Sequence, residues 1–462
     1  MASNGLSESF LAAIQASLSV LLVIFYGGVA AKLKILDAKS TKAISKICVR
    51  IFLPALLITK VGSQLDLDSV GNYGVILLWA LVCHGVSFLL GIFAHLVLKM
   101  PDWTTVALMF NNTTSYPLLL IGALGDTGIL KTLIEGDEGV NEATERAKAY
   151  FLIFSTVSSC LTFAVGPRLI DSEHGPDEEE GDEGDESQAN GHESGNGHSN
   201  QQIDGMGDGA DEETALLGET AQARRLTPFS DHNSFFPSSR KQSTSKAQPK
   251  DRRVSIVPRR YWNKLSPHSK WWIVFVTDFC NAPLLGAVLG AVIGLVPALH
   301  KAFFADTYGG GIFTAWLTSS LKNIGGLFVP LPVVVAGVSL YTSYEESREK
   351  KKSGDSQSAK LPVWTVVYIL LVRFVLWSGL SIGVIYGFAS AGLLGTDPML
   401  WFTMMLMPAG PPAMKLIAMV QVSQSGDEDE AMIAKVLTIA YLISPILSFT
   451  VVGSLTASRA CK

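Results

Sequence analysis

Two segments of this sequence combine polar and helix-breaking residues inside otherwise apolar runs. Residues 108–117 read Leu-Met-Phe-Asn-Asn-Thr-Thr-Ser-Tyr-Pro. Residues 407–415 read Met-Pro-Ala-Gly-Pro-Pro-Ala-Met-Lys, with three prolines and one glycine within five positions. A proline inside a helix removes a hydrogen bond and clashes with the preceding turn, at a cost of about 3 kcal/mol. We therefore predict that neither segment is a continuous helix, with breaks near 112–117 and 408–412, and that both line a cavity buried in protein.

Anion binding is the chemistry that such segments can perform. Side-chain amides and hydroxyls donate hydrogen bonds, and the N-terminus of a half-helix carries partial positive charge and unpaired N–H groups. Lys415 follows Pro412 by three residues and would add a full positive charge. The alternative is that the breaks serve packing alone. We predict a substrate-binding site composed of Asn111, Asn112, Thr113, Pro117, Gly410, Pro411, Pro412 and Lys415.

Three other ionisable residues, Asp278, Arg373 and His84, also lie within apolar runs. A charge at the centre of a membrane helix costs about 2.5–3.5 kcal/mol on insertion scales, so such residues face the protein interior or water. Asp278 and Arg373 are candidates for an ion pair or for coupling. Lys415 is an alternative partner for Asp278. For Arg373 and His84, bracing helices and touching substrate remain equally good interpretations.

The elements that must position these residues are apolar runs. Of 462 residues, 48% are hydrophobic and only 17% are charged, against about 25% charged in soluble domains. A helix of about 20 residues spans the ~30 Å hydrocarbon core of a bilayer. The sequence predicts an all-α polytopic membrane protein with ten transmembrane helices, near 10–31, 44–61, 75–98, 104–123, 147–169, 271–296, 312–341, 362–389, 398–421 and 431–455.

Residues 171–270 separate the first five spans from the last five. This segment carries a net charge of −7 and has an acidic, glycine-rich first half. It offers too little apolar surface to offset the entropy of ordering, so we predict a disordered loop. Lysine-rich connections after spans one and seven place the loop in the cytoplasm and both termini on the other side, by the positive-inside rule. The predicted domains are an N-terminal five-span repeat, the loop and a C-terminal five-span repeat, at 1–170, 171–270 and 271–462.

The two halves also resemble each other. Residues 109–122 align with 404–417 at a constant offset of 295, which places Pro117 on Pro412. Because each half has an odd number of spans, homologous halves would be inverted relative to one another. We predict two inverted five-helix repeats with crossing broken helices in spans four and nine. The alternative is ten generic apolar helices with chance matches.

This sequence resembles the auxin efflux carrier family of membrane transport proteins. The resemblance rests on the plan of five spans plus five, on the Pro-Ala-Leu-Leu run that begins at Pro54, and on the asparagines before Pro117. The two break segments are most similar to its PIN-like branch, especially fungal members. The resemblance covers about 10–170 and 271–456 and excludes the loop. It implies a site where the broken helices cross, and export or intracellular compartmentation of organic anions such as indole-3-acetate. It also implies residence in the endoplasmic reticulum, with the plasma membrane as the alternative.

In plant PIN carriers an asparagine beside the break in each repeat helps to bind the carboxylate. Asn112 fits that role in the first break. The second break departs from the pattern, because it has no asparagine between Leu406 and Lys415. This leaves Lys415 as the candidate for the missing polar contact and puts auxin as the substrate in question.

We therefore predict a secondary membrane transporter of a small organic anion, a carboxylate, that is not an enzyme and needs no cofactor or metal. The sequence has no phosphate-binding Gly-x-x-x-x-Gly-Lys-Ser/Thr loop, which argues against ATP-driven pumping. Its basic residues form no folded stripe, so nucleic-acid binding has no support. The alternative function is a membrane sensor or regulatory scaffold built on the carrier fold, with the central loop as its output.

The sequence of the loop indicates partners in addition to the substrate and the lipid bilayer. Ser243 and Ser255 each have two basic residues two and three positions before them, a pattern that suits a basophilic kinase. Two alternatives stay open, namely chance patterns in a basic segment and a tether to the anionic cytoplasmic leaflet. The sequence also leaves a homodimer open.

Overall fold

The computed structural model describes residues 2–65, 70–101, 103–134, 138–166, 169, 265–352, 362–414, 416 and 427–462. Within these ranges every regular element is a helix, and the β interaction present is an isolated bridge between Asn111 and Pro412. The prediction of an all-helical protein is therefore confirmed for the described residues. Most of the predicted loop, together with Ser243 and Ser255, lies outside them, and so does Lys415.

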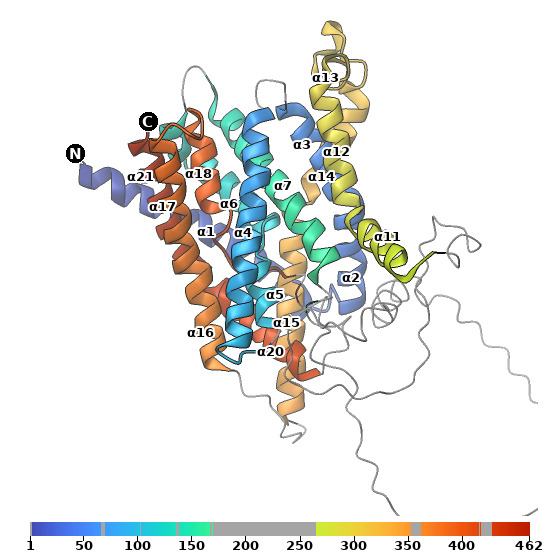
Figure 1. The fold of residues 1–462 in the computed structure, drawn as a ribbon, viewed down its shortest axis with the longest axis vertical. Coiled ribbons are helices and arrows are strands. Elements are labelled where there is room, and N and C mark those ends of the chain that lie inside the picture. Colours follow the sequence, from blue (N-terminus) through green and yellow to red (C-terminus); the bar gives the residue numbers. More distant parts are fainter. Residues whose placement is uncertain are drawn as a thin grey trace, which may run out of the picture.

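The helices of the first half form the blue-to-green part of the ribbon in Figure 1. The predicted second span is one continuous helical run that contains a π-helical segment, η1. In chain order the elements are α1 Ala2–Lys32, α2 Ala38–Ile47, η1 Cys48–Phe52, α3 Leu53–Gln64, α4 Val70–Leu96, α5 Trp103–Met109, α6 Ser115–Asp126, η2 Ile129–Leu133 and α7 Val140–Ala164.

The second half begins at α11, and η4 and η5 are its π-helical segments. Its elements are α11 Pro267–Phe279, α12 Ala282–Leu295, α13 Pro297–Phe304, η3 Thr307–Gly309, η4 Thr314–Thr318, α14 Ser319–Leu327, α15 Leu331–Lys352, α16 Val363–Leu371, η5 Val372–Leu376, α17 Trp377–Ser390, α18 Pro398–Leu406, α20 Asp427–Ile443, η6 Ser444–Ile446 and α21 Leu447–Ala460.

Five helical segments are long and apolar enough to cross a membrane, at 7–32, 70–96, 314–345, 363–390 and 432–460. The pair formed by α11 and α12 adds a sixth if its two parts, bent by 65°, count as one span. The bend falls where Asn281 accepts a hydrogen bond from the Leu284 N–H and so caps α12. The predicted spans four and nine are not among these segments, because their helices are too short: α5, α6 and α18 have 7, 12 and 9 residues. The number of ten spans stays a prediction.

Two short helices, α5 and α18, are completely buried, as expected for helices that are apolar all round. In contrast, α1, α4 and α12 expose large apolar side chains such as Phe25, Leu78 and Leu285. The molecule therefore surrounds two short central helices with a ring of longer helices whose outer faces suit lipid.

Glycines allow close helix packing in this ring. On α12, Gly286, Gly290 and Gly294 recur every four residues and face α3. A Cβ added to Gly286 would lie 2.6 Å from the Cα of Pro54. On α15, a Cβ added to Gly337 would overlap the Ile24 carbonyl of α1. Small residues at such spacing permit the close backbone approach that holds membrane helices together by van der Waals contact.

Both chain termini lie at one end of the bundle, and α2 and the lysine-rich C-terminal end of α15 lie at the other (Figure 1). The structure thus places the two basic connections on which the topology prediction depends at the same end. It also corrects one boundary. The predicted break at 112–117 is displaced, because the helix resumes at Ser115 and Pro117 lies in the first turn of α6, where a missing N–H does no harm.

Candidate functional site

The two breaks contact each other through their backbones. Helix α5 ends at Met109 and α6 begins at Ser115, while α18 ends at Leu406. The Asn112 N–H donates to the Pro411 carbonyl at 3.0 Å, and the Ala413 N–H donates to the Phe110 carbonyl at 2.9 Å. The prediction that neither segment is a continuous helix is confirmed for the described residues, and the two breaks form a short antiparallel pairing.

The side chains of Asn111 and Asn112, before Pro117, add hydrogen bonds around this pairing. Asn111 is 3% exposed, and its Nδ2 donates to the Met407 carbonyl at 2.9 Å. Asn112 Nδ2 donates to the Tyr441 hydroxyl of α20 at 2.8 Å. That hydroxyl donates in turn to the Pro412 carbonyl at 3.3 Å. Tyr441 therefore links one asparagine of the first break to the backbone of the second.

The end of α18 leaves carbonyl groups without helical partners, as every helix end does. Side chains from three surrounding elements satisfy them. Trp79 Nε1 of α4 donates to the Met404 carbonyl at 3.0 Å, and Ser381 Oγ of α17 donates to the Met405 carbonyl at 2.6 Å. Arg373 Nη1 of η5 donates to the Pro408 carbonyl at 3.2 Å. These donors thus satisfy carbonyl groups that the break leaves free.

Gly410 adopts a backbone conformation that few other residues can. Its φ is +130°, in the region that L side chains rarely adopt and that glycine populates freely. It directly precedes Pro411, whose carbonyl receives the Asn112 N–H. The glycine is therefore needed to turn the chain into the pairing.

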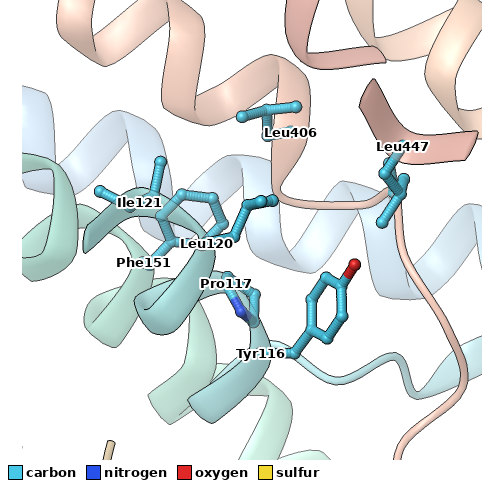
Figure 2. A pocket seen from close by; sticks show the side chains of 8 residues that line it. Tyr116, Pro117, Leu120, Ile121, Phe151, Leu406 and Leu447 are labelled. Carbon is cyan, nitrogen blue, oxygen red and sulfur yellow. The ribbon is translucent and has the colours of Figure 1, made fainter. Parts of the chain in front are cut away.

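An apolar cavity lies beside the paired breaks. It has room for about one water molecule. Figure 2 shows that side chains of α6 face Leu406 and Leu447 across it, and that the Tyr116 hydroxyl points toward Leu447. The lining comes from α6, α7, the end of α18, the break that follows it and the start of α21, through Tyr116, Pro117, Leu120, Ile121, Phe151, Leu406, Ala409 and Leu447.

A smaller and more polar cavity, too narrow to hold a water molecule, lies at the same breaks. Pro408 lines this cavity, whereas the adjacent Ala409 lines the apolar one. The described residues around it carry a guanidinium, an amide, an imidazole, a hydroxyl and a thiol. They are Cys83, His84, Ser87, Met109, Asn111, Phe154, Arg373 and Pro408.

Comparison with known proteins identifies the family of this chain. The model of the membrane transport protein family matches residues 12–452. The chain belongs to the membrane transport protein family. The resemblance to auxin efflux carriers and PIN-like proteins is thereby confirmed, and the chain is an integral multi-pass membrane protein.

Relatives of this membrane transport protein occur in fungi and plants. An uncharacterized transporter of Schizosaccharomyces pombe is 24% identical over 93% of this chain and 91% of its own length. An uncharacterized transporter of Saccharomyces cerevisiae is 28% identical over 37% of this chain and 27% of its own length. Protein PIN-LIKES 2 of Arabidopsis thaliana is 23% identical over 83% of this chain and 81% of its own length.

The predicted site residues of this family member divide into three groups. Thr113 and Pro412 lie buried in the breaks with Asn111, Gly410 and Pro411, next to half-buried Asn112. Pro117 lines the apolar cavity. Lys415 and the side chain of Asp278 lie outside the described residues, so the predicted pairings of Asp278 stay predictions.

Sequence reasoning missed three residues that organise the site. Tyr441, Trp79 and Ser381 donate to backbone carbonyls of the second break from α20, α4 and α17. Each is a single residue with a hydrogen-bonding group in an otherwise apolar run. Many residues of this kind pack away from any site, so the pattern does not single these three out. The signal that could have found them is the break itself, because it frees carbonyls that neighbouring helices must satisfy.

A network of ion pairs joins the start of α7 to neighbouring elements. Glu145 contacts Lys60 of α3 and Lys148. Arg146 contacts Glu138 at 2.7 Å and Asp397 at 2.8 Å. Asp397 also accepts hydrogen bonds from the Tyr150 hydroxyl and the Met399 N–H, so it caps α18. These contacts fix the N-terminal end of α18 against α7, at the end opposite to the one from which the second break extends.

Proposed function

We propose that this protein is a secondary carrier that moves a small organic anion, a carboxylate, across a membrane. The observation that carries the proposal is the backbone pairing of two broken segments among buried helices, with two small cavities next to it. In secondary transporters, discontinuous helices meet at the substrate site because their ends present unpaired polar groups. Membership of a membrane transport family supports the same function.

The proposed architecture is two inverted repeats of five spans each. Helix α5 begins at Trp103 and α18 begins at Pro398, which is the offset of 295 that aligns the two break segments in sequence. Equivalent helices that start at equivalent positions support a common origin of the halves. In this architecture the loop at 171–270 is cytoplasmic.

Within the site we propose distinct roles for the two breaks. Asn111, Asn112 and Thr113 supply polar contacts from the first break, while Gly410, Pro411 and Pro412 shape the second. Lys415, three residues after Pro412, adds positive charge. Lys415→Met should then weaken anion uptake by one to two decades. If Lys415 instead pairs with Asp278, the double change with Asp278→Asn should recover folding but not uptake, since removing one partner leaves a buried charge.

Transport of the anion alone is electrogenic. One elementary charge crossing ~100 mV is worth ~2.3 kcal/mol, which supports roughly a 50-fold gradient at ~1.4 kcal/mol per decade. A plasma membrane would thus drive the carrier without ion coupling. In the endoplasmic reticulum, where the potential is small, the carrier would equilibrate its substrate between compartments.

Uptake into proteoliposomes tests this function. The purified full chain would be reconstituted with a potassium gradient and valinomycin to set the potential, and labelled benzoate, indole-3-acetate, hexanoate and succinate would be offered separately. We expect saturable uptake of at least one acid that follows the sign of the potential. Absence of uptake for all four, from protein that is folded and inserted, would contradict the carrier function and favour the sensor or scaffold.

The loop proposals need separate tests. Phosphorylation of Ser243 and Ser255 by a basophilic kinase should leave a phosphopeptide signature that Ser243→Ala and Ser255→Ala remove. Crosslinking in native membranes would test for the homodimer.

A further inference from the structure

Two lysines follow membrane helices in a backbone conformation that lysine rarely adopts. Lys34 follows α1 with a φ of +57°, and Lys99 follows α4 with a φ of +55°. Among the described residues, these two are the non-glycine residues with a positive φ. Glycine usually occupies such a position after a helix, because an L side chain is strained there. The use of lysine at both turns therefore indicates a role for its side chain.

The turn at the end of α1 leaves apolar side chains exposed beside Lys34. The Lys34 N–H donates to the Ala31 carbonyl and the Ile35 N–H donates to the Ala30 carbonyl, both at 2.9 Å. In a helix end of this kind, the residue at the position of Ile35 usually packs back against the helix. Ile35 is instead 69% exposed, and Leu33 is 63% exposed. The turn thus presents a lysine between two exposed apolar side chains.

The turn at the end of α4 has the same features. Val97 and Leu98, which precede the exposed Lys99, are 61% and 44% exposed. Helix α3 leads away from the lysine-rich end of the bundle and α4 returns to it (Figure 1). Both turns therefore lie at the same end of the molecule.

Both turns also lie at the depth of lipid headgroups. The apolar segments that precede them, 7–32 and 70–96, have 26 and 27 residues. At ~1.5 Å per residue each is about 40 Å long, which exceeds the ~30 Å hydrocarbon core and reaches the headgroup regions. The exposed side chains beside Lys34 continue the outward face of α1, where Phe25 and Tyr26 are exposed as well. The neighbour that this surface fits is lipid.

Positive charge is in excess around Lys34. Residues 32–50 contain five lysines and one arginine but a single acid, Asp37. Asp37 accepts a hydrogen bond from the Ser40 N–H at 2.7 Å and caps α2. Lysines three positions apart share one face of a helix, as on α2. Four exposed lysines form no ion pair with any residue that the structure describes, namely Lys32, Lys34, Lys39 and Lys42.

We propose that the corner between α1 and α2, residues 32–42, binds the phosphate groups of anionic phospholipids in the leaflet at this end of the bundle. The lysines contact the phosphates as point charges, and Leu33 and Ile35 contact the acyl chains. Lys99 makes a second contact of the same kind. The inference is separate from the proposed transport function, because no residue of this corner lines either cavity beside the breaks.

Native mass spectrometry of the purified full chain tests this binding. Phosphatidylserine is titrated in a neutral detergent, with phosphatidylcholine as the reference lipid. The triple variant Lys34→Gln, Lys39→Gln and Lys42→Gln should bind phosphatidylserine about 10- to 100-fold more weakly, because each lysine near an anionic lipid adds binding energy. Its binding of phosphatidylcholine should not change. The matched control replaces three exposed lysines elsewhere with glutamine, at Lys131, Lys301 and Lys322.

Lys34→Gly separates lipid binding from folding. Glycine adopts a φ of +57° without strain, so this variant should melt in neutral detergent at least as high as the wild type. It should also lose part of the rise in melting temperature that phosphatidylserine gives the wild type. A full rise in this variant would refute the contact at Lys34, whether or not the triple variant folds.

Three further results would overturn the inference. Wild-type binding of phosphatidylserine in the triple variant, or an equal loss in the control, would show that the lysines of the corner form no lipid site. Binding of glycerophosphoserine, the soluble headgroup, as tightly as the lipid would refute the contact with acyl chains. Binding of a peptide of residues 171–223 to the wild type but not to the triple variant, with lipid binding unchanged, would assign the corner to the acidic loop.

Discussion

At the scale of residues, the centre of this protein depends on hydrogen bonds from side chains to backbone. A break in a buried helix frees carbonyls, and each free carbonyl costs energy unless a donor reaches it. Trp79, Ser381, Arg373 and Asn111 each supply one donor. These side chains come from different elements, so the break can form only when the surrounding bundle is assembled.

Tyr441→Phe should destabilise the protein by about 1–3 kcal/mol, the cost of leaving buried polar groups unsatisfied. The change removes the acceptor of Asn112 Nδ2 and the donor to the Pro412 carbonyl. Thermal unfolding in detergent measures the effect, with the exposed Tyr386→Phe as control. Equal melting temperatures for the two variants would show that the Tyr441 hydroxyl adds nothing to the pairing.

Gly410→Ala should cost about 1–3 kcal/mol through backbone strain. A Cβ at this position meets no atom within 4 Å, so the cost comes from the φ of +130° and not from a clash. Uptake should fall with stability, because the Pro411 carbonyl moves away from Asn112. Gly326→Ala on α14 also meets open space at an ordinary φ and serves as the control. A melting temperature and uptake equal to the control would contradict this account.

At the scale of elements, close glycine contacts set how the outer helices pack. Where α1 meets α15 and α3 meets α12, the backbones are too near for a methyl group between them. Lipid tails are as apolar as the helix surfaces, so the hydrophobic effect does not drive these helices together within a membrane. Van der Waals contact between closely packed helices must stabilise their association instead. The same helices carry the exposed apolar faces.

Gly337→Ala should destabilise the pair formed by α1 and α15 by about 1–3 kcal/mol, the usual cost of overpacking. The added methyl group overlaps the Ile24 carbonyl and forces the helices apart. Gly383→Ala on α17 meets nothing within 4 Å and should be neutral or stabilising by about 0.5–1 kcal/mol, because alanine favours helix. Proteolysis of detergent-solubilised protein compares the two. The reverse order of stability would show that α1 and α15 can separate without loss.

The sequence predicted the elements that contain the site better than it predicted the contacts within it. Prolines and asparagines in apolar runs predict interrupted helices, because their effect on the backbone depends only on neighbouring residues. The sequence predicted that the two breaks cross, but the atoms that meet there are not encoded locally, so the hydrogen bond from Asn112 to Pro411 and the contribution of Tyr441 could not be derived. Pro117 was placed inside the break because a proline looks the same in a first turn as in a helix interior.

At the scale of the whole molecule, the ends of the bundle differ in charge. The lysine-rich end holds α2 and the end of α15, and the opposite end holds both termini (Figure 1). Helix α1 has 31 residues, and at ~1.5 Å per residue it is longer than the ~30 Å hydrocarbon core. Its two ends should therefore lie on opposite sides of the membrane.

Cysteine labelling checks this arrangement. In a variant without the five native cysteines, Lys34→Cys should react with an impermeant maleimide only from the cytoplasmic side, and Lys462→Cys only from the other side. Sealed vesicles of known orientation distinguish the two. Labelling of both positions from one side would refute the predicted topology.

The pairing between the two breaks joins main-chain atoms, and this has an evolutionary consequence. Its two N–H···O=C contacts, from Asn112 to Pro411 and from Ala413 to Phe110, do not depend on which side chains those positions carry. The walls of both cavities consist of side chains, so mutation can enlarge, narrow or recharge them while the joint between the halves persists. In the proposed carrier, single substitutions in these walls would therefore change which substrate binds while the contact between the two breaks persists.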